Sequence, residues 1–241
     1  MDIHGNFDEK FQSIVDCYEN QFKLGLDIGS SLAVTYEGEI VIDIWAGTRD
    51  KAQSLPWEEN TIVNVFSSTK NATSLSAYVL ADQGKLDFSA PVAEYWPEFA
   101  QNGKENVLVS HIMSHSSGLA GWDEPVAGND LYDPDKVAAL FEAQAPWWKP
   151  GTALGYHAIS VGNLMGEIIK RISGKTVGNF FKDEIADPLD IDFHIGLEDK
   201  HHSRVAEIHQ AVESNPEDIF ELEEGSVMQK VMTNGIITAP D

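Results

Sequence analysis

Ser67 and Lys70 are the two residues of this sequence whose types and spacing suggest a chemical reaction. They lie in the stretch VFSSTK, with the hydroxyl three residues before the ammonium. Residues three apart share one face of a helix, and a serine becomes nucleophilic only when a base lies within hydrogen-bonding reach. A lysine with a lowered pKa is such a base, or it can prime another one. The pattern alone leaves a second interpretation open, a capping serine next to a surface lysine.

The residues around this pair predict where it lies in the fold. Residues 60–66 form an apolar, β-prone run, and after Ser67 apolar residues recur at helical spacing until Gly84 stops the helix. Ser67 is therefore expected where a strand ends and a helix begins. The free N–H groups and the dipole of a helix N-terminus favour negative charge on the serine oxygen.

Elsewhere the pattern runs from strands to helices. An amphipathic helix is expected near residues 7–24, followed by a hairpin that turns at Glu37-Gly38. A later helix begins at Asp133-Pro134, and two further helices break at Gly174. The predicted organisation is an N-terminal helix and strands at 1–66, a helical lobe at 67–197, and a charged tail at 198–241.

Composition excludes several kinds of partner. The 241 residues carry 39 acidic and 16 basic side chains, a formal net charge of −23, which repels nucleic acids and anionic membrane surfaces. The N-terminal residues have no signal-peptide pattern, and no apolar run approaches the roughly 20 residues that cross a bilayer. The single cysteine, Cys17, cannot form an internal disulfide and is expected to be buried. These features predict a cytoplasmic protein.

Four ordered blocks of the sequence resemble a known family. VFSSTK, HIMSHSSGL, WWKPGTALGYHAISVGNLMGEIIKRISGKT and DPLDIDFHIGL resemble successive segments of the serine β-lactamase-like hydrolases. The similarity is greatest to the class C-related esterases called family VIII carboxylesterases, and it extends from about residue 29 to residue 197. S-x-x-K is a motif of this superfamily. The resemblance implies an α/β (α+β) fold, with an antiparallel sheet flanked by helices and a mostly helical lobe.

The resemblance also implies roles for three residues. Ser67 would be the acylated nucleophile, and Lys70 would hold and polarise it. Tyr156 would be the general base toward Ser67 and later the acid toward the leaving alcohol. The implied activity is hydrolysis of a small carboxylic ester without a cofactor or metal. Without the resemblance, the favoured interpretation of Tyr156 is a packed tyrosine with its hydroxyl capped.

Two departures from the family pattern qualify this expectation. The second motif reads Tyr156-His157-Ala158, without the asparagine that β-lactamases carry at its third position. The family's third motif, on a strand near the C-terminus, is not readable after Leu197. We therefore expect an incomplete sheet with an open edge, weak or no activity of this chain alone, and association with itself or with a complementing C-terminal chain.

Other chemistries find less support in the sequence. His111 and His115 have a metal-binding spacing, but Ile112 stands where zinc proteases need glutamate, and the resemblance makes this block a structural turn after a short helix. The chain has no G-x-S-x-G and no P-loop. Two alternatives to an esterase remain, a β-lactamase or D,D-peptidase and a non-catalytic scaffold of the same fold.

Overall fold

The structure is a computed structural model that describes residues 2–209 and 223–236. These residues divide into two compact units, each described below by itself. The first unit comprises the described residues of 1–65 and 197–209, and the second comprises those of 66–196 and 223–236.

The first unit is built on a three-stranded antiparallel sheet. The strands are β1 (Ile3–Phe7), β2 (Gly29–Tyr36) and β3 (Glu39–Gly47), in the order β1-β3-β2. Between β2 and β3, Glu37 and Gly38 both have positive φ, 52° and 87°. That conformation defines the tight turn whose twist matches paired strands, so the predicted hairpin is confirmed.

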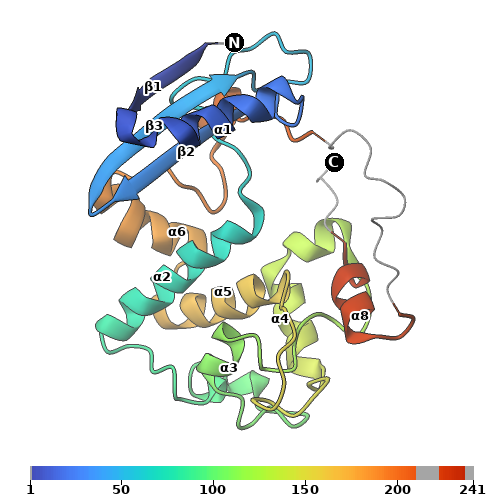
Figure 1. Ribbon diagram of the computed structural model, residues 1–241. Helices are drawn as coiled ribbons and strands as arrows, with labels where there is room; N and C mark the ends of the chain where they lie inside the picture. The colour runs from blue at the N-terminus through green and yellow to red at the C-terminus, as the bar shows by residue number, and fades with distance from the viewer. Residues whose placement is uncertain (1, 210–222, 237–241) are drawn as a thin grey trace. The chain divides into compact units, whose positions relative to one another are not determined.

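Helix α1 (Gln12–Lys23) lies across one face of this sheet (Figure 1). Its apolar side packs against the central strand, and the resulting core comprises Val15, Tyr18, Ile42, Ile44 and Ala46. Cys17 is exposed, so the prediction that this thiol is buried is wrong. The neighbouring apolar residues Val15 and Tyr18 lie on the face of α1 that packs against the sheet.

Three predictions for this unit need correction. The helix expected near residues 7–24 starts at Gln12, after a short 3₁₀ turn (η1, Glu9–Phe11) that Asp8 caps. The residues before it form β1, which the sequence did not predict. The run 60–66 is not a strand, and only Ile62 forms a bridge, to Val205. A second 3₁₀ segment, η7 (Asp199–Arg204), precedes that bridge.

The second unit is mostly helical (Figure 1). Helices α2 and α5 pack against each other. The longer helices are α2 (Thr69–Asp82), α4 (Pro134–Ala143) and α5 (Ser160–Ser173). The shorter helices are α3 (Val109–Met113), α6 (Val177–Phe181), α7 (Asp187–Leu189) and α8 (Val227–Thr233). A π-helical turn, η6 (Lys182–Ala186), joins α6 to α7. The 3₁₀ segments are η2 (Phe66–Ser68), η3 (Val92–Glu94), η4 (Pro97–Phe99) and η5 (Gly128–Tyr132).

Local signals explain several of these boundaries. Asp133 accepts hydrogen bonds from two backbone N–H groups at the start of α4, with Pro134 as its first residue. Gly174 ends α5 with a left-handed φ of 73°, which glycine adopts without steric cost. Both boundaries are those predicted from the sequence.

The helical unit has a small apolar cluster, formed by Ala72, Phe181, Ile185 and Ala186, and a large apolar core. Its largest fully buried side chains are aromatic or long aliphatic groups, among them Trp96, Phe99, Trp122, Phe141 and Leu164. Burying such a side chain contributes about 1.5–3 kcal/mol relative to leaving it exposed. This core holds α3 and α5 together. His115 lies just after α3, and Tyr156 lies just before α5.

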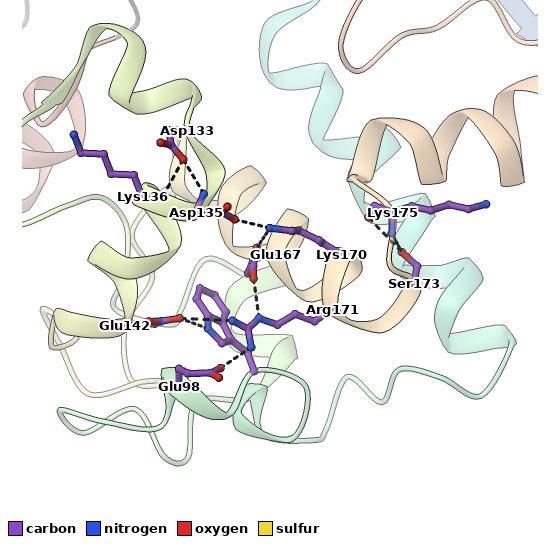
Figure 2. Close-up of polar contacts among 11 residues, drawn as sticks. Glu98, Asp133, Asp135, Lys136, Glu142, Glu167, Lys170, Arg171, Ser173 and Lys175 are labelled. Atoms are coloured by element: carbon purple, nitrogen blue, oxygen red, sulfur yellow. Dashed lines mark hydrogen bonds and ion pairs between the residues drawn. The ribbon is translucent and has the colours of Figure 1, made fainter.

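Charged side chains at the end of α5 form ion pairs with residues around them (Figure 2). The Arg171 guanidinium contacts the buried Glu167 carboxylate at 2.7 Å and the Glu98 carboxylate at 2.5 Å. Arg171 also lies over the Trp96 ring, 5.2 Å from its centroid. Lys170, the residue directly before Arg171, contacts Asp135 of α4 at 2.6 Å. A hydrogen bond from its own backbone and the hydrogen bond from Arg171 lower the pKa of the Glu98 carboxylate.

The tail also contains more structure than its composition predicts. Helix α8 is followed by a two-residue strand, β5 (Gly235–Ile236), which pairs in parallel with β4 (Val126–Ala127). The sequence did not predict this short strand; the expectation was only that the family's third-motif strand is not readable after Leu197. No helix in the described residues is long and apolar enough to span a bilayer.

Candidate active site

The backbone changes direction immediately before the predicted nucleophile. Phe66 has a positive φ of 46°, which is uncommon for a bulky residue and marks local strain. Ser67 then lies in the 3₁₀ segment η2, one turn before α2, rather than in the helix itself. Its side chain is exposed, and Lys70 on the first turn of α2 is partly buried.

The three residues predicted from the sequence lie together. The Tyr156 hydroxyl is 2.8 Å from Ser67 Oγ, although 89 residues separate them in the chain. Lys70 Nζ donates to Ser67 Oγ at 3.0 Å and to the Ala158 carbonyl at 2.7 Å. It also lies 5.0 Å from the centre of the Tyr156 ring. A hydroxyl, a phenol and an ammonium therefore form one hydrogen-bonded cluster.

The environment of Tyr156 favours its ionised form. The hydrogen bond with Ser67 lowers the pKa of the Tyr156 phenol most; burial opposes it, and the hydrogen bond and charge of Lys70 add to the lowering. A lowered pKa increases the fraction of phenolate present near neutral pH, and the phenolate is the form that can accept a proton. The side chain remains 48% exposed, so a small molecule can reach it.

The segment that carries Tyr156 is held by a second set of polar residues. His157 is fully buried, and its Nδ1 donates to the Gly155 carbonyl at 2.6 Å. Its Nε2 is 2.7 Å from Ser117 Oγ, so Ser117 is the donor in that contact. Burial, together with the nearby His115, lowers the pKa of His157 to about 4. The imidazole is therefore neutral at physiological pH.

His115 contacts the same segment from the end of α3. Its ring lies 5.0 Å from the Tyr156 ring and 5.4 Å from the His157 ring. Burial and the charge of Lys70 lower the pKa of His115. The sequence predicted a structural turn here, without a contact to Tyr156. No local sequence pattern indicated this contact, because the left-handed φ of His115 is visible only in the structure.

A small cavity adjoins Lys70 and His115. Its volume is about 40 Å³, close to the ~30 Å³ that one water molecule occupies in the liquid. The other lining residues come from α2, α3 and α5: Thr73, Ser74, Met113, Val161, Gly162 and Met165.

The histidine pair weighed as a metal site has another role. His111 Nδ1 accepts the Leu108 N–H at 3.2 Å, at the start of α3. Across residues 2–209 and 223–236, no group of three or more His, Cys, Asp or Glu side chains could hold a metal ion.

Comparison with known proteins identifies the family. The sequence profile described as Beta-lactamase matches residues 20–228, which is most of the chain. The chain belongs to the β-lactamase family. That assignment agrees with the resemblance seen in the ordered sequence blocks.

Individual relatives in the β-lactamase family are similar to much of the chain. The "Esterase/beta-lactamase LipL" of Mycobacterium tuberculosis is 36% identical over 198 residues, 80% of this chain and 45% of LipL. A crystal structure of a family VIII carboxylesterase is 41% identical, with a TM-score of 0.83 over 87% of this chain and 58% of the other. A penicillin-binding protein homologue from Caulobacter crescentus is 36% identical, with a TM-score of 0.84 over 87% and 57%.

These likenesses confirm the predicted fold class. The antiparallel sheet with a helix on one face and the mostly helical unit are parts of the β-lactamase/transpeptidase-like fold. The chain spans about half the length of the relatives it matches.

Proposed function

We propose that this protein is a serine hydrolase that cleaves carboxylic esters through an acyl-enzyme on Ser67. The observation that carries the proposal is the contact of Ser67 Oγ with both the Tyr156 hydroxyl at 2.8 Å and Lys70 Nζ at 3.0 Å. A nucleophile within reach of a base that a third group orients is the arrangement that covalent catalysis requires. Relatives named as esterases support the same chemistry.

The proposed reaction has two steps. The Tyr156 phenolate accepts the Ser67 proton as Ser67 Oγ attacks the ester carbonyl, and the phenol returns that proton to the departing alcohol oxygen. A water molecule then loses a proton to Tyr156 and attacks the acyl carbon, the acyl–Ser67 bond breaks to release the acid, and Tyr156 returns the proton to Ser67 Oγ. Lys70 stabilises the phenolate, and the Ser67 N–H is the candidate donor to the developing oxyanion.

A preference for esters over β-lactams is also part of the proposal. Ala158 stands at the third position of the second motif, where it offers Lys70 only its backbone carbonyl. Its methyl side chain cannot hydrogen-bond the amide of a β-lactam or peptide substrate. An ester also demands less, because an alkoxide leaves with less protonation than an amide nitrogen. Because other relatives are named β-lactamase or penicillin-binding protein, β-lactamase or D,D-peptidase activity is the alternative.

Labelling with a fluorophosphonate probe tests the nucleophile directly. We expect the folded chain to be labelled and Ser67→Ala to abolish the label. Ser68→Ala is the matched control, since it removes the neighbouring hydroxyl from the same turn and should keep the label. A folded chain that no probe labels would instead support a non-catalytic scaffold. Hydrolysis of p-nitrophenyl butyrate compared with nitrocefin separates an esterase from a β-lactamase.

Two further parts of the proposal concern the setting of the protein. We propose that it acts in the cytoplasm, which its single cysteine supports. We also propose that it associates with a second copy or with a complementing chain, because the chain covers only 45% and 58% of two relatives that it matches. Size-exclusion chromatography with light scattering measures the association, and a strict monomer with full esterase activity would refute it.

A further inference from the structure

His115 occupies a backbone position that favours glycine. Helix α3 ends with two characteristic hydrogen bonds, from Ser116 N–H to the His111 carbonyl at 2.8 Å and from His115 N–H to the Ile112 carbonyl at 3.1 Å. In this helix ending the residue at the position of His115 is left-handed and is usually glycine. His115 has a φ of 59°, a conformation that costs a residue with a side chain about 1 kcal/mol. A role for the imidazole would explain why histidine stands here.

The imidazole and the backbone of His115 hold the two residues on either side of Tyr156. Gly155 N–H donates to the His115 carbonyl at 3.0 Å. His157 N–H donates to His115 Nδ1 at 3.1 Å. The His115 ring also contacts the Tyr156 ring directly. His115 thus bonds to both chain neighbours of Tyr156 and contacts the Tyr156 ring itself.

We propose that His115 is a positioning residue, which sets the Tyr156 phenol against Ser67 by accepting the His157 N–H at Nδ1. The proposal rests on the function proposed for Ser67 and Tyr156, and it adds a residue that does not touch the reacting atoms. Only an imidazole with an unprotonated Nδ1 can accept this hydrogen bond. The remaining proton of the neutral ring is then on Nε2.

Protonation of His115 would break the contact. A protonated ring would turn an N–H at Nδ1 toward the N–H of His157, and it would add a positive charge beside Lys70. The titratable groups that face His115 are Lys70 on α2 and Tyr156 and His157 before α5. Burial and the Lys70 charge keep the pKa of His115 below its ordinary value, so the neutral ring persists below pH 6.5.

A pair of substitutions separates the side chain from the backbone. His115→Gly suits the left-handed φ but removes the acceptor. His115→Asn also tolerates this φ, and its Oδ1 can take the place of Nδ1. We expect His115→Gly to fold, since the relaxed φ offsets part of the lost contact, and to lower kcat for p-nitrophenyl butyrate by about 10–100-fold with little change in KM, as displacement of a catalytic group does. His115→Asn should stay within about threefold of the parent, because it restores the hydrogen bond.

Two further readouts respond to positioning and not to folding alone. On the acid side of pH 6.5 the parent's kcat should fall more steeply than that of His115→Asn, which has no ring to protonate. In ¹³C-tyrosine NMR, with the signal assigned by Tyr156→Phe, the phenol should titrate at a higher pH in His115→Gly, since it moves from Ser67 and Lys70. His111→Asn, a histidine change on the same helix, should leave this titration unchanged.

The outcomes distinguish the two proposals. Equal kcat values and equal Tyr156 titrations for the glycine and asparagine variants would overturn the role of His115, even in an active enzyme. If Ser67→Ala instead matches the parent in labelling and hydrolysis, the proposed function fails. The Tyr156 titration then decides the positioning role by itself, because it needs no turnover.

Discussion

The buried imidazole of His157 should make the stability of this protein depend on pH. His157 has no exposed surface, and burial lowers its pKa from the ordinary 6.5 to about 4. Because the unfolded chain binds this proton more tightly than the folded one, the free energy of unfolding decreases as the pH falls from 6.5 toward 4. Above pH 6.5 the ring is neutral in both states and contributes no pH dependence.

The size of the effect follows from the difference in pKa. Each pKa unit corresponds to about 1.4 kcal/mol, so protonation of His157 costs ~3 kcal/mol once the pH is below about 4. Between about pH 7.5 and pH 5 the loss from this one group should be about 2 kcal/mol. That is a large part of the 5–15 kcal/mol by which folded domains are typically stable.

Urea unfolding at the two pH values measures this loss. Asparagine at position 157 can still donate to the Gly155 carbonyl but does not titrate, so His157→Asn should be less stable at neutral pH and lose about 2 kcal/mol less on acidification. The control is His202→Asn, since the His202 side chain is 60% exposed. Equal acid losses in His157→Asn and the parent would refute the reasoning, because carboxylates and His115 titrate in both proteins.

Two other predictions concern the helical unit. Arg171→Met should reduce the free energy of unfolding by about 2–3 kcal/mol, because it leaves the Glu167 carboxylate, 8% exposed, without its closest cation. Adding Glu167→Gln should recover part of that loss in a double-mutant cycle by urea unfolding, and strictly additive losses would contradict the pairing. Gly178→Ala would place Cβ 2.0 Å from the Ile195 carbonyl oxygen and should cost about 3 kcal/mol. Gly162→Ala on α5 meets nothing within 4 Å and should stabilise by about 0.5–1 kcal/mol. Thermal unfolding compares the two alanines, and shifts of the same sign would count against the packing described.

Features that depend on neighbouring residues could be predicted from the sequence. The turn at Glu37-Gly38, the cap at Asp133 and the end of α5 at Gly174 each depend on the conformational preference of one or two residues. The spacing of Ser67 and Lys70 likewise predicts that their side chains meet. Local chemistry sufficed for these features because no distant partner is required.

Features that depend on distant partners could not be predicted in this way. β1 contains Gly5, which weakens any strand signal, and a Cβ at this position would lie 2.1 Å from the Asp43 carbonyl oxygen on β3. Tyr156 entered the prediction through family resemblance alone, since its contact with Ser67 spans 89 residues. The contact of His115 with Tyr156 is equally non-local, and no local pattern predicted it.

The strand order β1-β3-β2 suggests a sequence of folding events in the first unit. The β2–β3 hairpin closes over a two-residue turn, and such hairpins form in about 1–10 μs. β1 pairs with β3 across some 40 intervening residues, so it must wait until β3 has left the ribosome and pays a larger loop entropy. The N-terminal strand should therefore be the last of the three to acquire protection from hydrogen exchange and the first to lose it.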